Sequence, residues 1–289
     1  MGETVGLVGV GLVGAALAER LLAAGYGVLG YDIVSEKREH LVDLGGDAAE
    51  CAREVGERCE RVVLSLMTSE IVREVVGELL SADSPPSLIV DTTTGEPEAT
   101  EELAAQLGER GVAHLDATIS GSSAQVRAGE ALFTIGGAEA DVARAQDLLD
   151  TFTDRVIHVG PAGSGARSKL VINLIMGLNR VALAEGLAFA ESMGMELHSL
   201  VPVLEASMAY SRIMDTKAGK MVDGDFSTHG RLDQHRKDVA LILETATGLG
   251  QELPLSEAHL NVLDAGIAAG DAELDNSAII QEMRRRRAE

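Results

Sequence analysis

The amino-acid sequence predicts an α/β fold in two parts: a doubly wound sheet with flanking helices, followed by an all-helical domain. Three observations support this prediction. A glycine-rich turn stands between an apolar strand and a helix near the start of the chain. Strand and helix patterns then alternate up to about residue 159, and strand patterns cease beyond it. Strands that alternate with helices are typical of a parallel sheet covered on both faces.

The glycine-rich turn follows the apolar strand Thr4–Val8 and reads Gly9-Val10-Gly11-Leu12-Val13-Gly14. A helical pattern runs from Ala15 to Ala24, and a second strand, Val28–Asp32, ends in an acid. This is the GxGxxG fingerprint of dinucleotide-binding turns in its required context of strand, turn and helix. The sequence therefore predicts a Rossmann domain that binds a dinucleotide.

Each residue of the turn has a separate physical role in this prediction. Gly9 permits the tight turn, and Gly14 lets the helix lie close to the strand. Gly11 lets the backbone approach the pyrophosphate, which is favoured at the positive end of the helix. Leu12 and Val13 lie between these glycines, so we expect them beside the cofactor as well.

Asp32 bears on the choice between NAD and NADP. Its carboxylate can accept hydrogen bonds from the ribose 2′-hydroxyl, and its charge would repel a 2′-phosphate. We therefore predict that NAD is preferred. Lys37 and Arg38 follow closely and can tolerate a phosphate, so NADP stays open as an alternative.

Further strand patterns continue the alternation at residues 61–66, 88–91, 114–117, 132–136 and 155–159. Ligands of such sheets gather at the carboxyl ends of the strands. Four side chains follow predicted strand ends and are expected to line one crevice: Met67, Thr68, Thr94 and Ser120.

The composition shift near residue 162 predicts a domain boundary, with a dinucleotide-binding domain at 1–162 and a helical substrate and oligomerisation domain at 163–289. Gly, Pro and Asp residues mark the boundaries between the predicted helices. The predicted helices are 166–193, 197–208, 212–222, 233–248, 254–269 and 276–287. We expect the first of them, 166–193, to join the two domains.

Composition excludes several classes of function. Aromatic residues make up only 2% of the chain, and the formal net charge is −22. Both features argue against nucleic-acid binding. We find no pattern of a signal peptide and no charge-free apolar run of membrane-spanning length, so a cytoplasmic protein without a membrane partner is expected. The two cysteines, Cys51 and Cys59, lack metal-ligand spacing, and no metal site is predicted.

Lys169 and Asn173 stand just past a glycine-rich helix start. They are four residues apart, so they project from the same face of a helix. This arrangement suits a proton donor and its hydrogen-bonding neighbour. The alternative is a solvated lysine on a helix surface.

Four segments together resemble the β-hydroxyacid dehydrogenase family, which includes 3-hydroxyisobutyrate dehydrogenase, tartronate semialdehyde reductase and L-threonate dehydrogenase. Its first domain is like the NAD-binding domain of 6-phosphogluconate dehydrogenase. The segments are the glycine turn with Asp32, the loop Asp116–Ser122, the helix start Gly163–Asn173, and His235-Arg236-Lys237-Asp238.

The resemblance implies roles for residues of each segment. Lys169 would be the general acid/base, and Asn173 would hold Lys169 or the substrate hydroxyl. The substrate carboxylate would be bound by Ser120, Gly121 and Ser122. Further contacts to the cofactor would come from Leu66, Met67, Thr94 and Lys237. The resemblance also implies a homodimer or homotetramer.

Two residues depart from the family pattern Asp-Ala-Pro-Val-Ser-Gly-Gly. Thr118 replaces the proline and Ser122 the second glycine. A hydroxyl added near the carboxylate suggests a more polar substrate.

The resulting hypothesis is an NAD-dependent dehydrogenase of a small, polar, anionic 3-hydroxy acid or its semialdehyde. One alternative is an imine reductase of the same fold, a group in which the lysine is typically Asp or Tyr. Another is a non-catalytic nucleotide-binding interaction protein. The presence of Lys169 argues against both.

Overall fold

The computed structural model describes residues 2–287. The backbone separates into two compact units, Met1–Lys169 and Leu170–Glu289. Helix α8, Ser164–Ser192, begins in the first unit and continues in the second. We refer to the first unit as the sheet unit and to the second as the helical unit.

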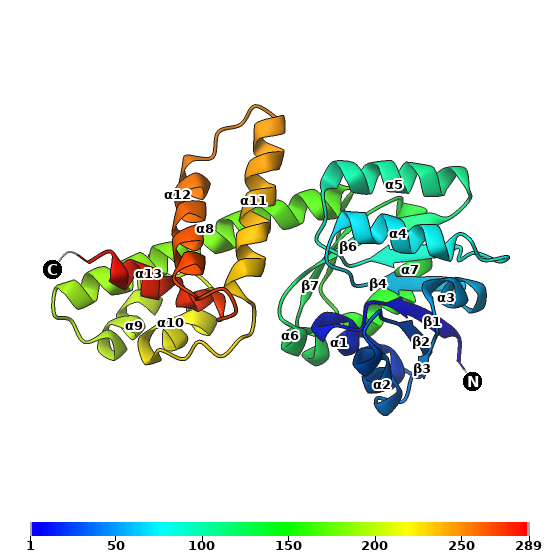
Figure 1. Ribbon diagram of the computed structural model, residues 1–289, viewed down its shortest axis with the longest axis horizontal. Helices are drawn as coiled ribbons and strands as arrows, with labels where there is room; N and C mark the ends of the chain where they lie inside the picture. The colour runs from blue at the N-terminus through cyan, green and yellow to red at the C-terminus, as the bar shows by residue number, and fades with distance from the viewer. Residues whose placement is uncertain (1, 288–289) are drawn as a thin grey trace. The chain divides into compact units, whose positions relative to one another are not determined.

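The sheet unit contains one eight-stranded sheet in the order β3-β2-β1-β4-β5-β6-β7-β8 (Figure 1). Strands β1 to β6 are parallel, so their carboxyl ends share one edge. The strands are β1 Thr4–Val8, β2 Gly27–Tyr31, β3 Asp47–Ala48, β4 Arg61–Leu64, β5 Leu88–Asp91, β6 Ala113–Ser120, β7 Leu132–Gly136 and β8 Val156–Gly160.

The prediction of an entirely parallel sheet is wrong at one place, because β7 pairs with β6 in the antiparallel sense. Strand β8 then runs parallel to β7. A parallel crossover needs a dozen or more residues. The connection from Gly121 to Ala131 is shorter and holds only the short helix α6, Ser123–Ala128. The chain therefore turns back along β6.

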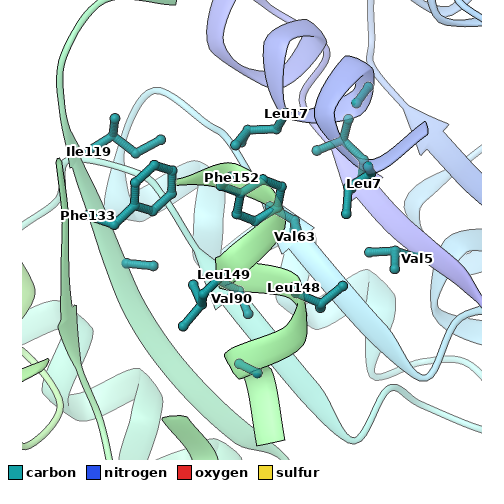
Figure 2. Close-up of a cluster of buried hydrophobic side chains, with 14 of the residues drawn as sticks. Val5, Leu7, Leu17, Val63, Val90, Ile119, Phe133, Leu148, Leu149 and Phe152 are labelled. Carbon is teal, nitrogen blue, oxygen red and sulfur yellow. The ribbon is translucent and has the colours of Figure 1, made fainter. Parts of the chain in front are cut away.

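Helices cover both faces of the sheet, and each face has its own apolar core. One core lies under α1, Leu12–Ala23, together with α6 and α7, Glu139–Phe152. Figure 2 shows part of this core, where the rings of Phe133 and Phe152 stack with centroids 5.7 Å apart. The other lies under α3, α4 and α5. The remaining helices of this unit are α2 Ser35–Asp43, α3 Ala52–Arg58, α4 Ser69–Leu79 and α5 Pro97–Glu109.

Three short elements of the sheet unit were not predicted: β3, α3 and α6. Each has seven residues or fewer. Their sequences are too short to show a clear apolar period. The longer elements lie close to their predicted bounds, although β6 extends to Ser120, beyond the predicted 114–117.

The helical unit consists of the larger part of α8 and shorter helices packed around it. Leu183, Leu187, Met221, Leu263 and Ile280 are among the residues of its core. Helices α11 and α12 lie side by side (Figure 1). The helices are α9 Leu197–Glu205, α10 Met214–Asp223, α11 Leu232–Gly248, α12 Pro254–Ala268, a 3₁₀ turn Asn276–Ala278 and α13 Ile279–Arg285. The last predicted helix, 276–287, is thus a 3₁₀ turn followed by a short α-helix.

Helix α8 is long and apolar enough to cross a membrane by length and composition, and 39% of its most apolar stretch is buried within the protein. Its buried side carries Asn173 and Arg180 as well as the core residues Ala184 and Leu187. These buried residues show that one side of α8 packs within the protein.

Candidate active site

The glycine turn between β1 and α1 has the shape that a dinucleotide requires. Gly9 has a φ of 94°, and a Cβ there would lie 2.2 Å from the Ser65 carbonyl oxygen. A Cβ at Gly14 would lie 1.9 Å from the Gly9 carbonyl oxygen. A Cβ at Gly11 would have no atom of the described residues within 4 Å. Packing therefore explains why positions 9 and 14 require glycine. Gly11, in contrast, leaves the turn open to close approach by a pyrophosphate.

Asp32 is held at the end of β2 by backbone N–H groups. Its Oδ2 accepts a hydrogen bond from Val10 of the turn at 2.8 Å, and its Oδ1 accepts one from Val34 at 3.0 Å. A carboxylate has further lone pairs, so it can still accept a ribose hydroxyl. Arg38 donates to the Asp32 carbonyl oxygen at 2.5 Å and lies over the Tyr31 ring. One positive charge is therefore close to this carboxylate.

The neighbouring strand ends, at β4 and β5, carry the other predicted cofactor residues. The N–H group of Leu66 donates to the Thr93 hydroxyl at 3.1 Å, which ties the two loops together. Met67 is 64% exposed. Thr68, in contrast, accepts the Ile71 N–H with its hydroxyl and caps α4. The residue after Thr93, Thr94, is partly buried on the same edge.

A buried acid lies at the end of β5. Burial raises the pKa of Asp91 to about 7, although the Thr93 N–H donates to it at 2.9 Å. The His114 ring is 3.9 Å away, and burial lowers the pKa of His114 to about 4. This histidine is therefore neutral near pH 7.

Lys169 reaches the substrate loop predicted from the sequence. Its Nζ donates to the Ile119 carbonyl oxygen at 2.5 Å, across 50 positions of the chain. Ser120 follows as the last residue of β6. The structure thus brings the predicted proton donor and the first residue of the predicted carboxylate loop together within the sheet unit.

Ser122 has a capping role in the structure. It is the N-cap of α6: its hydroxyl accepts the Gln125 N–H at 3.3 Å, and its own N–H donates to Gln125 Oε1 at 2.8 Å. The hydroxyl hydrogen of Ser122 is still available to donate to a ligand. The Thr118 hydroxyl is buried, donates to the Gly165 carbonyl oxygen at 3.0 Å and lies 2.8 Å from Thr134 Oγ1. Its presence is therefore explained by the fold rather than by the polarity of a substrate.

Asn173 lies in the helical unit and is 2% exposed. Its Nδ2 donates to Asp238 Oδ2 at 3.2 Å, which orients the amide. The Asn173 Oδ1 is buried and accepts no hydrogen bond from the described residues. A buried acceptor without a partner is costly, so this oxygen is suited to accept a further hydrogen bond. Lys237 directly precedes Asp238 on α11.

Sequence reasoning gave no role to Asp116, Thr118 or Asp238, although it quoted the segments that contain them. One signal was available: Asp116, Thr118 and Ser120 alternate along a strand and so share one face. The described residues hold no group of three or more His, Cys, Asp and Glu side chains placed to bind a metal ion.

Two family models match the chain in succession. Residues 4–160 match the NAD-binding domain of 6-phosphogluconate dehydrogenase. Residues 163–283 match the NAD-binding domain of NADP-dependent 3-hydroxyisobutyrate dehydrogenase.

Individual relatives align over nearly the whole length. The L-threonate dehydrogenase of Cupriavidus necator is 31% identical over 97% of this chain and 96% of its own. The 2-(hydroxymethyl)glutarate dehydrogenase of Eubacterium barkeri is 29% identical over 96% and 93%. The solved structure of 3-hydroxyisobutyrate dehydrogenase from Mycobacterium tuberculosis with L-serine has a TM-score of 0.90 and 27% identity over 98% and 100%. An imine reductase from Pseudomonas sp. shares the fold at 20% identity, with a TM-score of 0.65 and coverage of 98% and 100%.

Proposed function

Since the chain belongs to the β-hydroxyacid dehydrogenase family, we propose that it interconverts a small hydroxy acid and its carbonyl form with Lys169 as the general acid/base. The observation that carries this assignment is the bond from Lys169 Nζ to the Ile119 carbonyl oxygen. It holds the ammonium beside Ser120, where the substrate carboxylate is expected.

When bound, the nicotinamide supplies the hydride for reduction or accepts it in oxidation. In the reducing direction, Lys169 donates a proton to the carbonyl oxygen of the substrate, and in the oxidising direction it takes that proton from the hydroxyl. Asn173 supports this step through its buried Oδ1, which accepts a hydrogen bond from the lysine or from the substrate hydroxyl. By accepting a hydrogen bond from Asn173 Nδ2, Asp238 orients the Asn173 amide so that its Oδ1 can accept this hydrogen bond.

The substrate class is a small, polar, anionic 3-hydroxy acid or its semialdehyde. The loop Ser120–Ser122 offers the hydroxyl groups of Ser120 and Ser122 and the backbone N–H of Gly121 to a carboxylate, while the Ser122 N–H donates to Gln125 Oε1. The relatives are named for threonate, 2-(hydroxymethyl)glutarate and 3-hydroxyisobutyrate, all small hydroxy acids. The cofactor is NAD in preference to NADP because Asp32 would repel a 2′-phosphate. Lys237 binds the nicotinamide end of the cofactor.

The test is NADH production at alkaline pH from a panel of 3-hydroxyisobutyrate, glycerate, threonate, serine and longer sugar acids, with NADP in parallel. Lys169→Met should lower kcat by a factor of about 100 or more, since general acid/base catalysis contributes factors of this size. Cofactor affinity should be unchanged. Arg110→Met, which removes an exposed cation at the end of α5, is the matched control. Full turnover by Lys169→Met would disprove the assigned role.

We further propose that the chain forms a homodimer, or a homotetramer built from it, through an apolar stripe on α8. Val171, Ile175, Phe189 and Met193 are each more than half exposed in the monomer. Their spacing places them along one side of the helix. A groove of about 750 Å³ between α8, α12 and α13 borders the stripe, and Phe189 lines it. A second copy of the chain would remove this surface from water.

Light scattering coupled to size-exclusion chromatography tests the oligomer. Phe189→Glu should shift the protein toward the monomer mass because it places a charge within the stripe. Leu249→Glu, at an even more exposed apolar position at the end of α11, should leave the mass unchanged. A monomeric parent protein would contradict this proposal.

We expect the protein in the cytoplasm.

A further inference from the structure

Strand β6 presents Asp116, Thr118 and Ser120 on one face, because alternate residues of a strand point to the same side. Asp116 and Thr118 contact the start of α8, and Ser120 begins the proposed carboxylate loop. Between the last two, the Ile119 carbonyl oxygen accepts the hydrogen bond from Lys169. The same strand therefore contacts the proposed proton donor and leads into the proposed carboxylate loop.

Asp116 caps the start of α8 from a distance. Its Oδ1 accepts the Gly163 N–H and its Oδ2 accepts the Ala166 N–H, both at 2.9 Å. The first N–H groups of a helix have no partner within the helix, and a negative charge is favourable there. Burial raises the pKa of Asp116, while the bonds from Ala166 and Gly163 lower it. The carboxylate, which is 2% exposed, is thus committed to the helix start.

Thr118 holds the same turn through its hydroxyl. The hydroxyl donates to the Gly165 carbonyl oxygen at 3.0 Å and lies 2.8 Å from Thr134 Oγ1 on β7. A Cβ at Gly165 would lie 2.3 Å from the Asp116 carbonyl oxygen and 2.8 Å from that of Thr134. The first turn of α8 therefore lies directly against two strands, and its position depends on these contacts.

We propose that Thr118, together with Asp116, is a positioning residue that fixes the first turn of α8 against β6 and thereby sets the distance from the Lys169 ammonium to the carboxylate loop at Ser120. This inference rests on the proposed function and names a residue that sets its selectivity. A fixed distance between the proton donor and the carboxylate loop determines which carbon of a bound acid reacts. The residue responsible, Thr118, stands where the family pattern has proline.

Thr118→Val tests the proposal because it keeps the shape of the side chain and removes its hydroxyl. With the best acid of the panel, kcat should fall roughly tenfold to 100-fold, the scale expected for a misplaced catalytic group. The KM for NAD should stay constant, and the preference for 3-hydroxy over 2-hydroxy acids should shrink. Thr118→Ser, which keeps the hydroxyl, should restore both. The control is Thr153→Val, since Thr153 is also buried but its hydroxyl donates to the Ala131 carbonyl oxygen at 2.7 Å, away from α8.

Two readouts do not need turnover. Hydrogen exchange of the peptide spanning 163–170 should be faster in Thr118→Val than in the parent or the Thr153 control. The rate at which an acetylating reagent labels Lys169, relative to exposed Lys37, should change in the same variant. If the parent is inactive with every acid, the proposed function fails, yet these readouts still test the contact. Exchange and labelling equal to the control would overturn the proposal, and so would faster exchange with unchanged kcat.

Discussion

Replacing Asp32 by asparagine tests the basis of the preference for NAD, because the change removes the charge and nearly preserves the size. In the structure the carboxylate accepts hydrogen bonds from the N–H groups of Val10 at 2.8 Å and Val34 at 3.0 Å. It is therefore held in one place between the glycine turn and the end of β2. The single oxygen of asparagine can keep one of these bonds.

The expected magnitude follows from Coulomb's law. Two unit charges about 6 Å apart repel each other by roughly 0.7 kcal/mol in water and by roughly 2.8 kcal/mol at an effective dielectric constant of about 20. Asp32 is partly exposed, so its repulsion of a 2′-phosphate lies between these limits. Removing the charge should raise kcat/KM for NADP about three- to 100-fold. Arg38 stays bonded to the backbone of this residue and adds a positive charge near the phosphate.

The same variant should use NAD less well. A charged acceptor for the ribose hydroxyl is replaced by a neutral one, which costs about 1 kcal/mol, or about fivefold in kcat/KM. The ratio of kcat/KM for the two cofactors should therefore change by at least about 15-fold in favour of NADP.

Steady-state kinetics with both cofactors measures this ratio. Fluorescence titration with NADH and NADPH measures the dissociation constants of the two cofactors. The chain has no Trp whose emission would interfere with this titration. Asp47→Asn, an exposed acid on the adjacent strand β3, is the control for a general loss of negative charge. An Asp32→Asn variant whose ratio stays at the parent value would refute the assigned role of this carboxylate.

Three further predictions follow from named contacts. Gly14→Ala would place a Cβ 1.9 Å from a backbone oxygen of the glycine turn, so NADH affinity should fall about tenfold in the same titration. Asp275→Ala would leave the Lys217 ammonium buried without its 2.7 Å partner, and denaturant unfolding should show a loss of about 3 to 5 kcal/mol. Hydrogen bonding to Arg61 lowers the pKa of Asp147 from 3.8 to about 2. The stability that this ion pair contributes is present above about pH 4 and is lost as the pH falls through 2. The loss is at most about 1 kcal/mol, because Asp147 is half exposed. In Asp147→Asn this part of the pH dependence of unfolding should be absent.

The sequence was sufficient for the glycine turn and for the long elements because their signals are local. A turn that needs glycines at fixed positions, and a strand of buried Val and Ile such as Leu88–Asp91, can be recognised without knowing what packs on them. The direction of β7 is different, since it depends on what fits into the connection after Ser120. Helix α3 has only seven residues, several of them charged, and its existence depends on packing against β1 and α4.

The candidate site shows the same division between local and distant signals. Lys169 and Asn173 could be paired from their spacing on a helix, but Asp238 as the partner of Asn173 lies 65 positions away. From the sequence, Thr118 was only a departure from the proline of the family pattern. In the structure, its acceptor is the Gly165 carbonyl oxygen, 47 positions later. A pattern shows that a polar group is present, whereas only the fold shows which group it bonds.

The two residues at the centre of the proposed chemistry have anchors in different units of the protein. Lys169 bonds to β6 of the sheet unit, and Asn173 bonds to Asp238 of the helical unit. Both belong to the same continuous helix, α8. Four residues of an α-helix span about 6 Å along the axis whatever surrounds them. The axial spacing of these two backbone positions is therefore a property of α8 itself, which keeps it constant for any arrangement of the two units that leaves the helix intact.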